Sequence, residues 1–272
     1  MSHNPDADIK LAHRIADVAA EIALAYFESP IEQWGKTDGT PVSAADLAVE
    51  RALLDVLASE RPEDAVISEE AGEVGASHRR WILDPIDGTT PFLAGEPRWG
   101  TNIALEVDGE LAVGVITRPA RGLRWWAARG DGAYRTSTVA PDLRDQRLAV
   151  SSRAFLAEAV VTAFAWPESA TPSDLAAHAR WLDVEEELCV VGAVAEGRLD
   201  VFVQEAGGVW DHSPQVLLVT EAGGSFRDPH GGARYDLGPG LYTNGLLESE
   251  VLQATAQSWP PPRRLDPPTT ST

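Results

Sequence analysis

The run Trp81-Ile-Leu-Asp84-Pro-Ile-Asp87-Gly-Thr-Thr90 decides how the rest of the chain is interpreted. Its apolar start predicts a buried strand, and the Pro and Gly that follow predict that this strand ends there. The continuation Thr89-Thr-Pro-Phe92 predicts a short helix with a threonine cap and an early proline. Two carboxylates at such a junction suit a hard divalent cation, and the free amides of a helix start attract phosphate. The run therefore favours phosphoryl chemistry, although Asp-Pro-x-Asp-Gly is also an ordinary turn sequence.

Two other acidic segments lie where secondary-structure elements are expected to begin or end. Residues 65–72 read Ala-Val-Ile-Ser-Glu-Glu-Ala-Gly, a short β-like run that ends in the pair Glu69 and Glu70. Because adjacent side chains on an extended segment point to opposite faces, we expect only one of the pair to reach the site and the other to support it. Residues 209–214, Val-Trp-Asp-His-Ser-Pro, open a helical pattern, and His212 at this helix start is expected at the surface.

The apolar pattern along the chain predicts helices first and strands afterwards. Helical spacing predicts a helix over 8–28, and Ser43 with Asp46 forms a capping-box pattern that opens a second helix, ending at 61–62. From 102 to 150 the pattern changes to short strands separated by turns. We therefore expect two helices in one layer and a sheet in the next. Later strand-like segments are 199–203 and 241–243.

Composition limits the classes of protein that need to be considered. The chain has 272 residues, 44% of them hydrophobic, which is enough to bury a large core. Its net charge of −20, with no dense run of Lys or Arg, argues against a nucleic acid partner. The single cysteine, Cys189, excludes an intramolecular disulfide and suits a reducing cytoplasm, and no secretory or membrane-spanning segment is visible. We therefore expect a soluble, cytoplasmic protein.

We expect three parts along the chain. Residues 1–150 are predicted to form an N-terminal α+β subdomain with the metal and phosphate site, and residues 151–258 a C-terminal α/β subdomain. The Pro-rich tail, 259–272, cannot build a core and is expected to be disordered.

Taken together, the acidic segments resemble the Mg²⁺-dependent, lithium-sensitive inositol monophosphatase family. The resemblance extends from about Ala12 to Leu252, nearly the full chain. It implies an α/β fold, namely a layered αβαβα sandwich whose two subdomains meet at the metal site, and it implies a homodimer. The family signatures are an acid pair after a strand, W-x-x-D-P-x-D-G-T-x-x-F, W-D-x-x-P and E-A-G-G, matched here at 69–70, 81–92, 210–214 and 221–224.

The same resemblance implies roles for individual residues. Oxygen ligands would select Mg²⁺, with Mn²⁺ as the alternative ion. Glu69 and Thr89 would orient the attacking water, Asp46 would hold Thr89 through a hydrogen bond, and no covalent enzyme intermediate is expected. The implied metal ligands are Glu69, Asp84, the carbonyl of Ile86, Asp87 and Asp211. The implied phosphate-binding amides are those of Gly88, Thr89 and Thr90.

The residues that would choose the substrate are less clearly marked. The small-residue segment that the family usually has before a later helix is replaced here by Asp183-Val-Glu-Glu-Glu187, and in the histidinol-phosphate phosphatase branch an aspartate falls in the register of Glu187. An acid there suits a cationic substrate, although three successive glutamates are usually a solvated helix face. Pro91 stands where the family usually has asparagine, which a first helical turn tolerates. The candidate substrate-binding residues are Glu186, Glu187 and Glu205.

These patterns predict Mg²⁺-dependent hydrolysis of a small phosphate monoester, with histidinol phosphate as the leading substrate and no nucleic acid or membrane partner. Inositol 1-phosphate or another cyclitol or sugar phosphate is the alternative within the same chemistry. A non-catalytic, metal-binding homologue is the alternative from another class, and the retained set of implied ligands argues against it. A nucleotide 3′-phosphatase or fructose bisphosphatase relative is disfavoured, because the chain lacks a basic pocket for a second phosphate.

Overall fold

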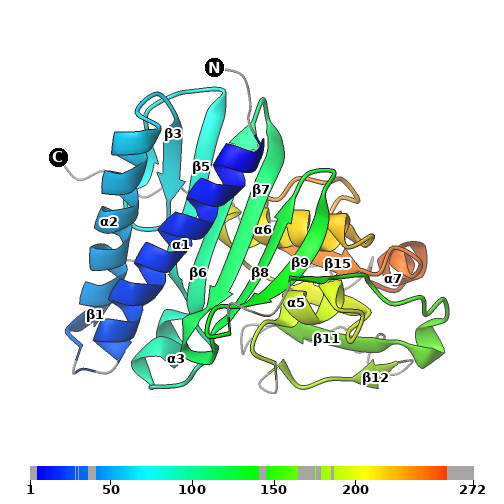
Figure 1. Ribbon diagram of the computed structural model, residues 1–272. Helices are drawn as coiled ribbons and strands as arrows, with labels where there is room; N and C mark the ends of the chain where they lie inside the picture. Colours follow the sequence, from blue (N-terminus) through cyan, green and yellow to red (C-terminus); the bar gives the residue numbers. More distant parts are fainter. Residues whose placement is uncertain are drawn as a thin grey trace.

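The computed structural model describes residues 5–27, 29, 31–35, 41–140, 145–164, 175, 179–184 and 187–255. Two long helices, α1 (Pro5–Phe27) and α2 (Ala44–Glu60), lie side by side over one face of a large sheet (Figure 1). Ser43 caps α2, and its backbone N–H donates to the Asp46 carboxylate in the predicted capping box. Both predicted helices are therefore confirmed. A short ribbon of β1 (Gln33–Gly35) and β2 (Pro41–Ser43) precedes α2.

The large sheet has eight strands in the order β10-β9-β8-β7-β6-β5-β3-β4. Neighbouring strands are antiparallel except β3 and β5, which are parallel. The predicted strands over 102–150 are confirmed, and glycines with positive φ occupy the predicted turns at 108–109, 121–122 and 130–132. The strands are β3 (Ala65–Ser68), β4 (Gly72–Val74), β5 (Arg79–Asp87), β6 (Gly100–Val107), β7 (Glu110–Arg118), β8 (Leu123–Ala128), β9 (Gly132–Ser137) and β10 (Gln146–Arg147).

A second sheet of five strands lies apart from the first, in the order β12-β11-β13-β15-β14. Helices α5 (Val190–Ala195) and α6 (Val209–Glu221) fill the space between the two sheets, and α7 (Glu248–Thr255) packs on the outer face of the second (Figure 1). The layers therefore run α, β, α, β, α, as expected. The strands are β11 (Val160–Phe164), β12 (Arg180–Trp181), β13 (Val201–Gln204), β14 (Ser225–Arg227) and β15 (Gly240–Thr243).

Strand β5 separates two hydrophobic cores. Trp81 and Leu83 point into the core under α1 and α2, whereas Ile82 points into the core that contains α5 and α6. Since side chains alternate along a strand, Asp84 follows Ile82 onto the α6 side. The apolar alternation of β5 thus brings an acid into the middle layer, directly after the core residues Trp81, Ile82 and Leu83.

The expected boundary near residue 150 lies in the connection from β10 to β11. Because one core joins α5 and α6 to strands of both sheets, we propose that the two parts are subdomains of one packed unit. The segment 256–258 and the predicted tail 259–272 lie outside the described residues.

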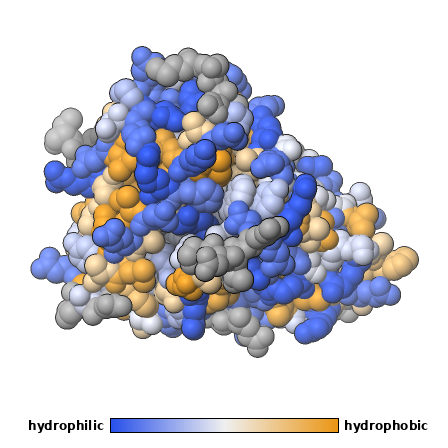
Figure 2. Space-filling view, in the orientation of Figure 1, coloured by the Kyte–Doolittle hydropathy of each residue, from blue (hydrophilic) through white to orange (hydrophobic). Residues whose placement is uncertain are grey.

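The face seen in Figure 2 is mostly hydrophilic, and its apolar residues form separate patches, the larger ones over the layer of α1 and α2. Among the described residues, no helix combines the length and the apolar character needed to cross a membrane.

Candidate active site

Three aspartates from two distant segments meet in the middle layer. Asp84 and Asp87 lie at the end of β5, Asp211 lies in the first turn of α6, and one carboxylate oxygen of each lies within 4.8 Å of the others. Strand β5 continues through Pro85 to Asp87, with an irregular register against β6 between Asp84 and Asp87. The strand ends at Asp87, directly before Gly88, so the predicted strand end at the glycine turn is confirmed. The irregularity accommodates a residue without N–H, and Thr101 Oγ1 donates to the Pro85 carbonyl at 2.9 Å.

The turn after β5 depends on a glycine. Gly88 has φ of 87°, and a Cβ atom there would lie 2.8 Å from the Arg98 carbonyl oxygen. Gly88 precedes the short helix α3 (Thr89–Leu93) as its cap, so the predicted threonine cap was wrong. Pro91 is the third helical residue, a first-turn position where its missing N–H costs no helical hydrogen bond.

Asp211 is held at the start of α6 by the backbone. The Gly208 N–H donates to Asp211 Oδ2 at 2.5 Å, and a carboxylate is favoured at a helix N-terminus. Burial nevertheless raises the pKa of Asp211 to about 8, with contributions from the negative charges of Asp87 and Glu69. Burial, together with the repulsion among these carboxylates, therefore outweighs the hydrogen bond from Gly208.

Asp84 is the most deeply buried of the three clustered aspartates. Burial, and then the charges of Glu69, Asp87 and Asp211, raise its pKa well above the ordinary value. Its Oδ1 atom is buried and has no hydrogen-bond partner among the described residues. An unpaired buried oxygen among like charges is costly unless a cation binds there. An all-oxygen set of this kind fits Mg²⁺.

A hydrogen-bonded chain links the turn after β5 to the start of α2. Thr89 Oγ1 lies 3.2 Å from the Ile86 carbonyl oxygen and 3.4 Å from Asp46 Oδ1. Asp46 is buried, and its Oδ2 accepts from Ser43 Oγ at 2.6 Å. The cap of α2 therefore also orients the carboxylate that faces Thr89. A carbonyl oxygen has two lone pairs, so the contact with Thr89 leaves Ile86 one for another partner.

Glu69 and Glu70 lie in a turn after β3, and the extended segment assumed for them was wrong. The turn is held by Glu50 of α2, whose Oε1 accepts from Ser68 Oγ at 2.5 Å and from the Ala71 N–H at 2.7 Å. Burial raises the pKa of Glu50, and the neighbouring Glu69 adds to the shift. Glu50 was not among the predicted site residues, because its distance along the chain gave no signal of this contact.

Two further residues beside the aspartates were missed. Arg118 donates from Nη2 to Asp87 Oδ2 at 2.8 Å. Asn102 is fully buried and lies opposite Asp84 in the pairing of β5 with β6, and neither of its amide atoms has a hydrogen-bond partner among the described residues. An asparagine within an apolar strand was a usable signal. Arg118, at the end of β7, gave no such signal, since strands often end in charged residues.

His212 is fully buried, so the expectation of a surface position was wrong. Its Nδ1 lies 2.6 Å from the Tyr242 hydroxyl and its Nε2 2.6 Å from the Gly238 carbonyl oxygen. Burial lowers its pKa to about 4. The physical reason is that α6 lies between two sheets, so its residues are covered on both sides.

The three candidate substrate-binding residues differ in their surroundings. Glu187 forms an ion pair with Arg198, in which Nη2 donates to Oε2 at 3.0 Å and Nη1 to Oε1. Glu205 follows β13, and its backbone N–H donates to the Phe164 carbonyl. Glu186 lies outside the described residues. The roles predicted for these residues, and for the metal and phosphate ligands, stay predictions.

Comparison with known proteins gives one family. The model of the inositol monophosphatase family matches residues 4–259. A relative from Streptomyces griseus named glucose-1-phosphate thymidylyltransferase is 49% identical, over 85% of this chain and 89% of its own. A histidinol-phosphatase from Mycobacterium tuberculosis is 38% identical, over 93% of this chain and 98% of its own.

Solved structures agree with the family model. The inositol monophosphatase from Anabaena (Nostoc) sp. PCC 7120 superposes with a TM-score of 0.77 at 26% identity, covering 95% of this chain and 98% of that one. The match of fold extends over both sheets, and the family model includes both segments that supply the aspartates. This chain belongs to the inositol monophosphatase family and is a phosphomonoesterase.

Proposed function

We propose that the protein hydrolyses a small phosphate monoester with Mg²⁺, and that histidinol phosphate is the first candidate substrate. The observation that carries the proposal is the buried Oδ1 of Asp84, which lies among three clustered carboxylates and has no hydrogen-bond partner in the ranges that the structure describes. Mg²⁺ held there by Asp84, Asp87, Asp211, Glu69 and the Ile86 carbonyl would neutralise the ester oxygens and the leaving alkoxide.

The residues around the cluster supply the rest of the reaction. Glu69 and Thr89 would orient a water for in-line attack on phosphorus, with no enzyme-bound phosphate. Asp46 would fix the Thr89 hydroxyl, and it is itself fixed by the cap of α2. The amides of Gly88, Thr89 and Thr90 begin α3, where the first N–H groups have no acceptor within the helix, and they would bind the phosphate oxygens.

Histidinol phosphate is supported as a substrate by the 38% identical relative named histidinol-phosphatase, which aligns over nearly the full chain. The amine of this substrate would need an acidic partner. Glu187 is available for that role only in competition with Arg198, which contacts both of its carboxylate oxygens. We therefore expect either an exchange of partners on binding or a contact to Glu186 or Glu205 instead.

A sugar 1-phosphate is the second candidate. The Arg198 ion pair offsets part of the negative charge that would favour an amine, and the name of the 49% identical relative contains glucose 1-phosphate. That name describes nucleotidyl transfer rather than hydrolysis. Transfer releases pyrophosphate from a nucleoside triphosphate, so the two reactions are separated by their products.

The experiment is an assay of phosphate release with Mg²⁺ from histidinol phosphate, inositol 1-phosphate and glucose 1-phosphate, with Asp84→Asn as the matched control. We expect turnover of at least one ester and its loss in the control. A parallel assay with dTTP and glucose 1-phosphate would measure pyrophosphate. Pyrophosphate formation without hydrolysis of any ester would overturn the proposal.

We also propose that the protein is a cytoplasmic homodimer. The proposal rests on the family and on the single, buried Cys189, which suits a reducing compartment. Light scattering after size exclusion would measure the mass, and a monomer would contradict the dimer.

A further inference from the structure

Arg118 is held beside the aspartate cluster by three contacts in different directions. Its Nη2 donates to Asp87 Oδ2 at 2.8 Å, its Nε to the Leu188 carbonyl at 2.7 Å, and its Nη1 to the Thr117 carbonyl at 2.7 Å. The residue is 8% exposed. The guanidinium is therefore fixed by the fold, which distinguishes it from a surface arginine that happens to meet an acid.

The neighbouring strand is built to admit this side chain. A Cβ atom on Gly100 would lie 2.7 Å from Arg118 Nη1 and 1.7 Å from the Thr117 carbonyl oxygen. Any larger residue at this position of β6 would displace both. The close approach of β6 and β7 here thus requires glycine, and it leaves room for the guanidinium next to Asp87.

The position of Arg118 has two consequences for the aspartate cluster. Its positive charge acts on Asp87 and also on Asp84, so it offsets part of the negative charge that would attract a metal. Its Nε bond reaches Leu188, the residue after the candidate substrate contact Glu187. The same side chain therefore joins a predicted metal ligand to the segment that leads to the candidate substrate pocket.

We propose that Arg118 is a positioning residue that acts as a built-in cation at Asp87, weakens the binding of a divalent cation there and ties this carboxylate to the backbone at Leu188. This inference rests on the proposed function, because the cation is taken to be Mg²⁺. Arg118 then sets how much Mg²⁺ the site needs, without contacting the substrate.

The test is calorimetric titration of the full-length, metal-free protein with Mg²⁺ alone. Arg118→Gln should lower the dissociation constant for Mg²⁺ by about tenfold or more. Two charges a few ångström apart in a partly buried site interact with a larger free energy than a tenfold change in affinity requires. Arg118→Lys keeps the charge and should retain an affinity close to that of the wild type.

A matched control is Arg124→Gln. Arg124 is about as buried, at 6% exposure. It lies in the neighbouring strand β8, opposite Thr117, and its side chain forms an ion pair with Asp17 of α1. The substitution changes net charge by the same amount on the opposite side of the sheet, and we expect no comparable change in Mg²⁺ affinity.

A double-mutant cycle with Asp87→Asn locates the effect. Once Asp87 has lost its charge, adding Arg118→Gln should produce a much smaller gain in Mg²⁺ affinity than it does in the wild type. Circular dichroism and the melting temperature check that each variant folds. If Arg118→Gln fails to fold, Arg118→Met is titrated with the same expectation.

The outcomes separate the inference from the proposed function. Unchanged or weaker Mg²⁺ binding in Arg118→Gln and Arg118→Met would overturn the inference, since Arg118 would then only orient Asp87 as a ligand. Absence of Mg²⁺ binding by the wild type would overturn the proposed metal-dependent reaction and the inference with it. Equal gains in the Arg118 and Arg124 variants would also overturn the inference, because the effect would be that of net charge.

Discussion

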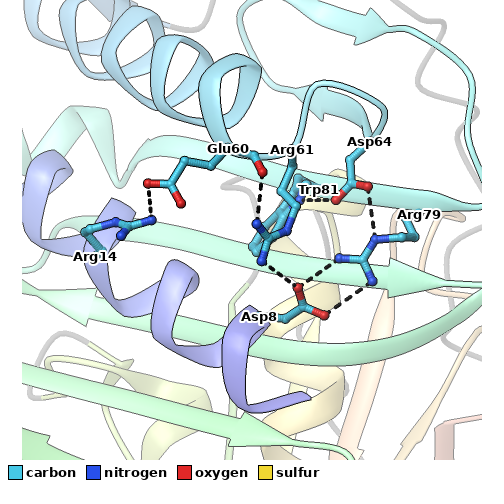
Figure 3. A network of polar contacts seen from close by, with 7 residues as sticks. All are labelled: Asp8, Arg14, Glu60, Arg61, Asp64, Arg79 and Trp81. Atoms are coloured by element: carbon cyan, nitrogen blue, oxygen red, sulfur yellow. Dashed lines mark hydrogen bonds and ion pairs between the residues drawn. The ribbon is translucent and has the colours of Figure 1, made fainter. Parts of the chain in front are cut away.

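The two ends of strand β5 treat buried charge in opposite ways. At its start, Arg79 donates to Asp8 at 2.9 Å and to Asp64 at 3.0 Å, and Trp81 donates to the other oxygen of Asp64 at 2.9 Å (Figure 3). At its end, Asp84 meets other acids, and its buried Oδ1 has no hydrogen-bond partner within the described part of the chain. One strand thus carries a network in which the buried charges are paired with opposite charges, and a cluster in which like charges lie together.

The difference separates an end that stabilises the fold from an end that we propose serves the reaction. The Arg79 network joins the start of α1, the end of α2 and the start of β5, so it connects two layers (Figure 3). The aspartate cluster brings like charges together, which costs stability in the absence of a cation. Strain of this kind is typical of binding and catalytic sites.

The largest effect is expected from breaking the paired end. Arg79→Met removes one partner and leaves Asp8 and Asp64 buried without their main cation, which costs about 3–5 kcal/mol in the free energy of unfolding. Denaturant unfolding measures this change. The matched control is Arg80→Met at the next position, whose guanidinium is more exposed and contacts Glu73 and Glu106. Similar losses in the two variants would contradict a special role for the network.

The unpaired end should respond in activity. Asp84→Asn keeps the size of the side chain but removes charge from the proposed metal site, so we expect a loss of kcat/KM of about 10²-fold or more. Because like charges are relieved, the metal-free variant should be at least as stable as the wild type. Activity within a few-fold of the wild type, or a large drop in stability, would remove Asp84 from the ligand set.

We expect the free energy of unfolding to fall at acidic pH because of His13 in α1. This residue packs against Trp126 and lies 3.1 Å from Arg124, and burial, with the Arg124 charge, lowers its pKa to about 4. The unfolded chain binds the proton near the ordinary value of 6.5, so stability is lost as the pH falls from 6.5 towards 4.

The loss should reach about 2 kcal/mol between pH 7 and pH 5, by linkage at 1.36 kcal/mol per pKa unit. It is measured as the difference in unfolding free energy between the wild type and His13→Gln, both saturated with Mg²⁺. A difference that does not change with pH would show that His13 titrates normally.

A smaller effect is expected at Thr89. Thr89→Ala removes the hydroxyl that faces Asp46 and should lower kcat by about tenfold with little change in KM, since the contact is used at the transition state. Thr90→Ala, on the next residue of α3, is the control. A rise in KM alone would place Thr89 in ground-state binding.

Much of the frame was predictable because it depends on local rules. The alternation of Trp81, Ile82 and Leu83 assigns the faces of β5, and Ser43 with Asp46 marks the start of α2. The acids were identified from motifs at the ends of elements. These features depend on neighbours in the sequence, which a single chain displays directly.

The contacts that were missed depend on how segments come together in the fold, and most of these segments are distant in the chain. Arg118 meets Asp87 and Leu188 only after β5, β7 and the segment before α5 have come together. Glu187 was predicted to face a substrate amine, and Arg198 contacts it in the structure. His212 is buried because two sheets cover α6. No periodicity or spacing in the sequence predicts such contacts.

The central claim is that the cluster at the end of β5, where Asp84 Oδ1 has no hydrogen-bond partner among the described residues, binds a divalent cation. Thermal unfolding with increasing Mg²⁺ tests it without any substrate, because a ligand that binds only the folded state stabilises it by about 2.7 kcal/mol at one hundred times its dissociation constant. The account predicts a melting temperature that rises with Mg²⁺ in the wild type and in Arg79→Met, but hardly at all in Asp84→Asn. No rise in the wild type, or the same rise in Asp84→Asn, would contradict it.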